Sequence, residues 1–255
     1  MLLRRVMEHV KAQNWTAVAL DFFIVVVGVF IGIQVANWND ARVERSSEAQ
    51  FLVSLEQDMK ESIAEVDDIV RQLRAHDQAR ETLYNYSLGE RDGIDPPTLS
   101  KTVHRGLWSF ASMELRLTTF DTLRSSGRLG ILGDDALVLA LQDLAALIDE
   151  AEFEEAFEMH ALERFTDPYL YQNVDMGGVL TTPSLSTGEV FVPWLDQKSE
   201  EFTVPSNIAS QELRNGILIR SASANERIGS LEKIRDKCAE ISARIIARLD
   251  ELGAR

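Results

Sequence analysis

The sequence predicts an all-α fold in which an N-terminal transmembrane helix leads into an elongated antiparallel helical bundle with one long irregular loop. The first observation is the apolar stretch from Trp15 to Trp38. The second is that residues 41–86 and 209–252 carry apolar side chains every three or four positions, the periodicity of amphipathic helices. We therefore divide the chain into a basic tail (1–14), a transmembrane helix (15–38) and a helical domain (39–255).

The stretch from Trp15 to Trp38 has the length of a membrane-spanning helix. Residues 22–33 contain no polar side chain. At a rise of about 1.5 Å per residue the stretch is roughly 35 Å long, which crosses a hydrocarbon core of about 30 Å and leaves one tryptophan as an anchor at each interface. A cleaved signal peptide is the alternative. Asp21 near the start of the run and the absence of a small-x-small cleavage site favour an uncleaved anchor.

One face of this helix has the composition of a packing face. At about 100° per residue, it carries Ala17, Asp21, Gly28, Gly32 and Val35. The two glycines have the GxxxG spacing that lets helix backbones approach closely. An acid costs about 2.5–3.5 kcal/mol at the centre of a membrane helix, which favours a protein-facing side for Asp21. The alternative is that Asp21 reaches the interface and that the glycines are ordinary residues of a membrane helix.

Flanking charge predicts the orientation of the helix. Residues 1–14 carry three basic side chains and one acidic side chain, whereas Arg42 and Arg45 on the other flank are offset by Asp40 and Glu44. Basic residues accumulate on the cytoplasmic side of membrane helices. We therefore expect a cytoplasmic tail and an extracytoplasmic domain, which is periplasmic in a Gram-negative bacterium.

Composition limits the partners and the redox chemistry. The chain has a formal charge of −15; the tail contributes +2 and Asp21 −1, so the residues from Asp40 onward carry −16. This charge repels nucleic acid and anionic lipid head groups, and we expect no nucleic-acid partner. Cys238 is the single cysteine, which excludes an intramolecular disulfide and a thiolate metal cluster. Its place on the apolar side of a predicted helix indicates a buried, inert thiol.

Helices and breaks alternate after the first long helix. Residues 87–97 are rich in Gly, Pro and Asp and predict a loop. Shorter helices are expected at 98–112 and 117–126, and Gly127 fits the C-cap of the second because glycine adopts the left-handed conformation without strain.

The second half of the domain begins with a helix that Asp134 or Asp135 caps and that runs to about Phe165. Residues 166–207 contain four prolines and a Gly-Gly pair, which predicts a long irregular loop without helix, with a short strand at 189–192. The last long helix then pairs antiparallel with the first and returns the C-terminus towards the membrane.

We recognise no catalytic, cofactor-binding or metal-binding constellation in the sequence. The four histidines are scattered, and none lies in an HxxxH, HExxH or ExxH motif. Residues 150–158 hold the densest group of carboxylates beside His160, but a di-iron helix would need a glutamate where Phe157 stands. We therefore predict a solvated acidic face with a surface histidine. Residues 125–130 lack the lysine and the preceding strand of a phosphate loop, which favours a helix cap and turn.

Several stretches resemble one family. Residues 21–40 (DFFIVVVGVFIGIQVANWND) resemble the N-terminal anchor of uncharacterised bacterial single-pass membrane proteins, in which an acid precedes an Ile/Val-rich run that ends in Gln and then Asn-Trp-Asn. Residues 119–127 (TFDTLRSSG) and 212–215 (ELRN) resemble two further motifs of that family. The resemblance implies a helical protein of the bacterial inner (cell) membrane. Because the family has no known function, it implies no catalytic residue.

These observations favour a non-enzymatic, membrane-anchored scaffold or accessory protein. It would contact the lipid bilayer and would assemble through its transmembrane face and its coiled helices, as a homo-oligomer or with another membrane protein. A periplasmic ligand-sensing bundle that signals through a partner protein is the alternative, because stalked helical bundles are the shape of chemoreceptor input domains. An enzyme with an unrecognised site is the third hypothesis. We expect no cofactor.

Overall fold

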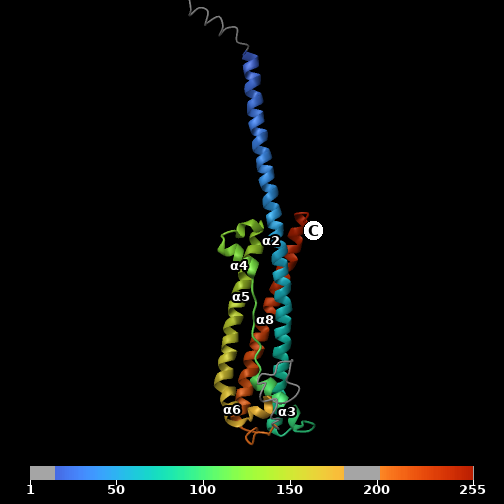
Figure 1. Ribbon diagram of the computed structural model, residues 1–255, viewed down its shortest axis with the longest axis vertical. Coiled ribbons are helices and arrows are strands. Elements are labelled where there is room, and N and C mark those ends of the chain that lie inside the picture. Colours follow the sequence, from blue (N-terminus) through green and yellow to red (C-terminus); the bar gives the residue numbers. More distant parts are fainter. Residues whose placement is uncertain (1–14, 181–201, 255) are drawn as a thin grey trace, which may run out of the picture.

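The computed structural model describes residues 15–180 and 202–254, and this part of the chain is built of helices without a strand (Figure 1). The predicted all-α class is confirmed. The predicted tail (1–14) and the predicted strand (189–192) lie outside the described residues.

The first helix, α2 (Trp15–Leu88), joins the apolar stretch and the first amphipathic helix into one element. No glycine or proline occurs between Gly32 and Gly89, so nothing in the sequence interrupts the backbone hydrogen bonds. Gly89 ends the helix with φ 106°, and Glu90 N–H donates to the carbonyl of Asn85. About half of α2 projects beyond the bundle, and the other half forms one of its edges (Figure 1).

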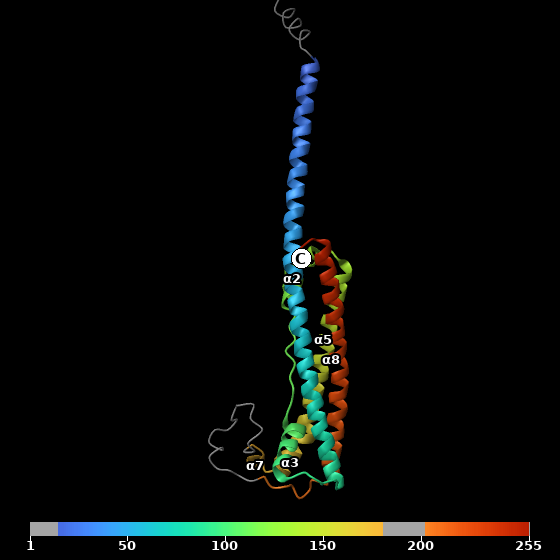
Figure 2. The ribbon, with the colours of Figure 1, turned by 90° about the vertical axis from the view of Figure 1, so that its right-hand side faces the viewer.

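The bundle consists of α2, α5 (Asp135–Ala161) and α8 (Gln211–Glu251). Helix α8 packs along both α2 and α5, and it brings the C-terminus back to the end where α2 leaves the bundle (Figures 1 and 2). We call this the proximal end and the opposite one the distal end. The antiparallel pairing of the two long helices is thus confirmed. Asp134 caps α5 by accepting from Ala136 and Leu137 N–H, and Ser210 caps α8 by accepting from Leu213 N–H.

The burial pattern of α2 explains why it pairs with α8. Its buried apolar side chains recur at steps of three and four residues along the bundle, a period close to that of a coiled coil. They include Leu52, Leu55, Met59, Val66 and Leu73. Together with the inward faces of α5 and α8 they form one elongated core, whereas a second apolar cluster fills the distal end.

The connection between the distal and the proximal end differs from the prediction. The predicted helix 98–112 is observed as α3 (Pro96–Val103) and a π-helical turn η1 (His104–Trp108), after which Ser109 adopts an extended conformation. Residues 109–117 then run without helix along the bundle to α4 (Thr118–Ser125) at the proximal end (Figures 1 and 2). Ala111 and Leu117 of this segment are buried in the core between the long helices.

The predicted glycine cap and turn are confirmed. Gly127 follows α4 with φ 67°, and Arg128 N–H donates to the carbonyl of Leu123. The 3₁₀ turn η2 (Leu129–Leu132) then leads to Gly133 and α5.

The prediction that residues 166–207 contain no helix was wrong for their first part. The π-helical turn η3 (Leu162–Thr166) extends α5, and α6 (Asp167–Asn173) and α7 (Met176–Leu180) follow. Pro168 lies in the first turn of α6, where its missing N–H would have had no helical partner, so it does not break the helix.

Gly133 lies against the contact that fastens α2 to the bundle at the proximal end. Arg248 Nε of α8 donates to Glu48 Oε1 of α2 over 2.7 Å, and Glu48 is buried. Gly133 has φ 61°, and a Cβ atom there would lie 2.7 Å from Arg248 Nη2 and 2.8 Å from Glu48 Oε1.

We expect Gly133→Ala to lower the free energy of unfolding by about 2 kcal/mol, because it combines an unfavourable φ with overpacking against this ion pair. Urea unfolding of the full chain measures the change. Gly130→Ala is the matched control, since no described atom lies within 4 Å of its added Cβ and its φ is not positive. Equal stability of the two variants would contradict the expectation.

Candidate functional site

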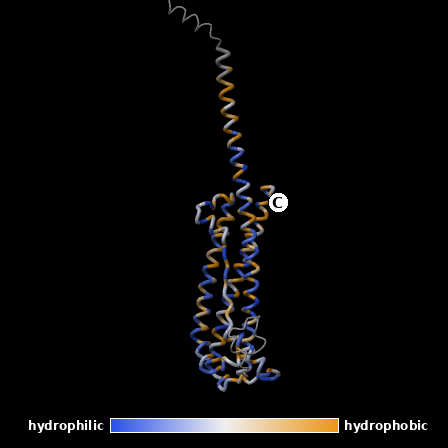
Figure 3. Tube along the Cα trace, viewed as in Figure 1, coloured by the Kyte–Doolittle hydropathy of each residue, from blue (hydrophilic) through white to orange (hydrophobic). Residues whose placement is uncertain are grey.

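The first candidate site is the exposed apolar surface of α2 beyond the bundle (Figure 3). Phe22 is 71% exposed and Trp38 is 62% exposed, and the aliphatic side chains between them are exposed as well. Among the described residues, α2 is the one helix that is long and apolar enough to cross a membrane, and its most apolar window has no buried residue. An apolar surface of this extent is unfavourable in water and marks a membrane or protein contact.

The predicted packing face lies on this part of α2. No described atom lies within 4 Å of a Cβ placed on Gly28 or Gly32, and Val35 is exposed, so the bundle leaves this face open. Trp15, Ala17 and Asp21 belong to α2, but their side chains lie outside the described set. The helical backbone places these positions at the predicted angles, with Ala17 and Asp21 in line with the two glycines.

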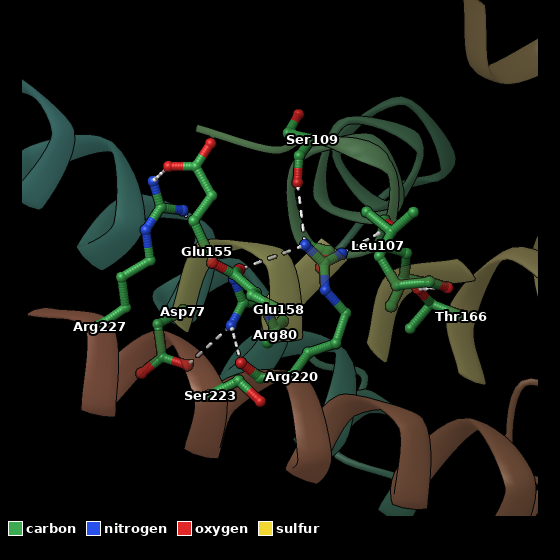
Figure 4. A network of polar contacts seen from close by, with 12 residues as sticks. Asp77, Arg80, Leu107, Ser109, Glu155, Glu158, Thr166, Arg220, Ser223 and Arg227 are labelled. Atoms are coloured by element: carbon green, nitrogen blue, oxygen red, sulfur yellow. Dashed lines mark hydrogen bonds and ion pairs between the residues drawn. The ribbon is translucent and has the colours of Figure 1, made fainter. Parts of the chain in front are cut away.

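The second candidate site is a group of four fully buried charged side chains near the distal end, which we call the buried charge layer (Figure 4). It consists of Arg80 from α2, Glu158 from α5, and Arg220 and Arg227 from α8. Three guanidinium groups therefore share the interior with one fully buried carboxylate. Burial of a charge costs several kcal/mol unless it is paired and hydrogen-bonded. The stability of the layer therefore depends on the partners of each charged group.

Glu158 lies at the centre of the layer. Its Oε2 accepts from Arg227 Nη1 over 3.0 Å, and its Oε1 lies 3.6 Å from Arg220 Nη2 and 3.9 Å from Arg80 Nη2. The carboxylate of α5 thus joins guanidinium groups from α2 and α8.

Arg220 binds the end of the π-helical turn η1. It donates to the carbonyls of Leu107 over 2.7 Å, Ser109 over 3.2 Å and Gly106 over 3.4 Å. The last carbonyls of a helix have no hydrogen-bond donors within the helix, and here the Arg220 guanidinium donates to them instead. Arg80 Nη1 in turn donates to the carbonyl of Arg220 over 2.9 Å. The two arginines therefore connect α2, η1 and α8 through backbone groups.

Arg227 fixes the extended segment that follows η1. It donates to Glu155 Oε2 over 2.6 Å, and the same oxygen accepts from Met113 N–H over 2.9 Å. The guanidinium carbon also lies 5.4 Å from the ring centre of Phe110, at the distance of a cation–π contact. Residues 110–113 are thereby held against α5 and α8.

Two glycines allow the helices to approach at this level. A Cβ on Gly106 would lie 3.2 Å from the backbone nitrogen of Arg80, and a Cβ on Gly216 would lie 3.2 Å from the carbonyl oxygen of Phe165. Both π-helical turns, η1 and η3, therefore pack with their backbones close to a long helix on either side of the buried charge layer.

The environment of the layer shifts several pKa values. Burial lowers the pKa of Arg220 to about 10, with Arg80 adding to the effect, and burial also lowers the pKa of Arg80. His76 lies one turn before Arg80 on α2. Burial, reinforced by the nearby guanidinium groups, lowers its pKa to about 4. Both arginines thus stay charged at neutral pH, and His76 stays neutral.

The prediction of a solvated acidic face at residues 150–158 was wrong for Glu158, which is buried, and Glu155 is hydrogen-bonded at the edge of the layer. His160 is exposed, as predicted. No local pattern in the sequence indicates the layer, because the arginines that pair with Glu158 lie on other helices, far away in the chain.

The described residues contain no group of three or more His, Cys, Asp or Glu side chains that could hold a metal ion. Cys238 is buried in the core, so the predicted burial of the thiol is confirmed, and burial raises its pKa to about 12. The buried charge layer joins α2, α5, α8 and η1 through ion pairs and hydrogen bonds, and the part of α2 beyond the bundle exposes its apolar side chains.

One comparison with known proteins finds a match, and it lies on α2. Residues 21–92 match the model of a family of unknown function (DUF6090). The match covers α2 from Asp21 and the turn that follows it, which is less than a third of the chain. No curated protein and no solved structure matches the chain. The chain is therefore similar over its long first helix to a family whose function is unknown.

Proposed function

We propose that this protein is a single-pass, membrane-anchored interaction module that acts without catalysis, as a scaffold or accessory subunit. The exposed apolar part of α2 crosses the inner membrane of a bacterium, and its Gly28/Gly32 face packs against a second membrane helix. The observation that carries the proposal is that α2 is a single uninterrupted helix, with its apolar half exposed and its amphipathic half built into the bundle.

Because α2 is one continuous helix, its part in the membrane and its part in the bundle rotate together. A contact made in the membrane fixes the rotation of α2, and α8 and Arg248 fix the bundle to α2. Assembly in the membrane therefore also sets the rotation of the bundle about the axis of α2. The positive charge of residues 1–14 supports a cytoplasmic tail and a periplasmic bundle.

Chemical crosslinking in native membranes tests the proposal. We expect a specific higher-mass species for the wild-type chain and loss of most of it for the double variant Gly28→Leu/Gly32→Leu, because leucine side chains keep the backbones apart. Val26→Leu/Phe30→Leu is the matched control, since it has the same spacing on the opposite face of the helix.

All variants are first extracted with alkali to establish that they remain in the membrane. Absence of any higher-mass species in the wild type, or equal amounts in all variants, would contradict assembly through this face. Release of the wild-type chain by alkali would contradict the membrane anchor itself.

A further inference from the structure

We infer that the partner of α2 is a second copy of this chain, and that the contact continues beyond the apolar stretch along an uncharged stripe of α2 formed by Ser46, Gln50, Val53 and Gln57. The inference rests on the proposed function and deepens it, because it names the partner and extends the contact to the part of α2 that belongs to the bundle.

The stripe continues the line of the glycine face. Ser46, Gln50 and Val53 follow Gly28, Gly32 and Val35 by eighteen residues each, and Gln57 follows Asn39 by the same number. Eighteen residues are about five full turns of an α-helix. Since α2 is unbroken over this range, the two sets lie on the same side of one helix.

The stripe also faces away from the bundle. Each of Gln50, Val53 and Gln57 precedes a fully buried residue of the core by two positions, which is about 200° around the helix. All four stripe residues are exposed, and Val53 is 53% exposed although it is aliphatic. Both views show α2 at the edge of the bundle, so a second α2 can approach along this side without meeting α5 or α8 (Figures 1 and 2).

The absence of charge on the stripe favours a second copy of this chain as its partner. Two copies anchored in one membrane stand parallel, so each residue of a shared face meets its own counterpart, and like charges on the part of that face beyond the apolar stretch would repel each other. The stripe carries no charge from Ser46 to Gln57, although the chain has a net charge of −15 and acids such as Glu44, Glu56 and Asp58 lie on other sides of α2. A basic partner would instead be attracted to those acidic sides.

The side chains of the stripe suit a parallel helix pair. Asparagine at the contact of two parallel helices specifies pairing by hydrogen-bonding to its counterpart, and Asn39, Gln50 and Gln57 have the same capacity across a two-fold axis. Val53 supplies apolar contact and Ser46 permits close approach. Arg42, the charged residue in this line between Val35 and Gln57, lies about 6 Å beyond Trp38 at helical rise, where lipid phosphates are within its reach. The two bundles then lie on the outer sides of a central α2 pair.

Disulfide crosslinking in native membranes tests the inference. Single cysteines are introduced as Ser46→Cys and Val53→Cys on the stripe, and as Ser47→Cys and Ser54→Cys one position further, about 100° around the same helix. Cys238 can stay in place, because its buried thiol with a pKa of about 12 does not form disulfides under mild oxidation. We expect a dimer at least fivefold more abundant for positions 46 and 53 than for positions 47 and 54.

Equal crosslinking at all four positions would indicate collisions of freely rotating helices and would overturn the inference, as would stronger crosslinking at positions 47 and 54. Absence of dimer at every position, in chains that resist alkaline extraction, would also overturn it while leaving the proposed function intact, since the partner is then another protein. If alkali releases the chains, the proposed function fails together with the inference.

Discussion

Glu158→Gln is expected to lower the free energy of unfolding by about 3–5 kcal/mol, because it removes the fully buried carboxylate of the layer, which pairs with Arg80, Arg220 and Arg227. The substitution changes the shape of the side chain little, so the lost stability measures the effect of removing the charge and not a change in packing. Arg227 keeps Glu155 as a partner and Arg80 keeps Asp77, whereas Arg220 loses the carboxylate that lies 3.6 Å from its Nη2.

Denaturant unfolding of the full chain in mild detergent, followed by circular dichroism, measures this change. Glu150→Gln is the matched control, since Glu150 lies on the same helix and is exposed. We expect the control to stay within about 0.5 kcal/mol of the wild type. If Glu158→Gln does the same, the buried charge layer does not hold the distal end together.

The second large effect is a loss of stability in mild acid that originates at His76. Burial lowers the pKa of His76 to about 4 in the folded chain, whereas an unfolded histidine titrates near 6.5. Between these two values the unfolded state binds a proton that the folded state does not, so stability falls as the pH decreases from about 6.5 to 4. At about 1.4 kcal/mol per pKa unit, the loss approaches roughly 3 kcal/mol near pH 4.

Urea unfolding at a series of pH values between 7 and 4.5 isolates this contribution when the wild type is compared with His76→Gln. We expect the variant to lose less stability over this range, because glutamine does not titrate. His160→Gln serves as the control, since it removes an exposed histidine instead of a buried one. Identical slopes for the wild type and His76→Gln would show that His76 is not shielded from protonation.

The periodic parts of the fold could be predicted from the sequence, because they depend on local patterns. The spacing of apolar residues in α2 and α8 repeats over many turns, so it indicated both helices, their pairing and the burial of Cys238. The caps at Asp134 and Gly127 also depend on a few adjacent residues. Where a residue's neighbours in the chain decide its conformation, that conformation can be predicted from a single sequence.

The buried charge layer could not be predicted in this way. Arginine and glutamate are ordinarily surface residues, and Glu158 stands in a run of acids that suggests a solvated face. Its burial depends on Arg80, Arg220 and Arg227, which only the folded bundle brings together. The early end of the helix at Trp108 has the same origin, because Arg220 binds the carbonyls of η1 from another helix.

The measurement that tests the central claim most directly is a cysteine-accessibility scan along α2 in sealed native membrane vesicles. Single cysteines at Val26, Phe30 and Val35, and at Val43 and Arg45, are exposed to a membrane-impermeant maleimide from each side. If one helix both crosses the membrane and enters the bundle, the first three stay unlabelled, and the last two react from one side only. Labelling at Phe30 in intact vesicles, or labelling of Val43 and Arg45 from both sides, would contradict the account.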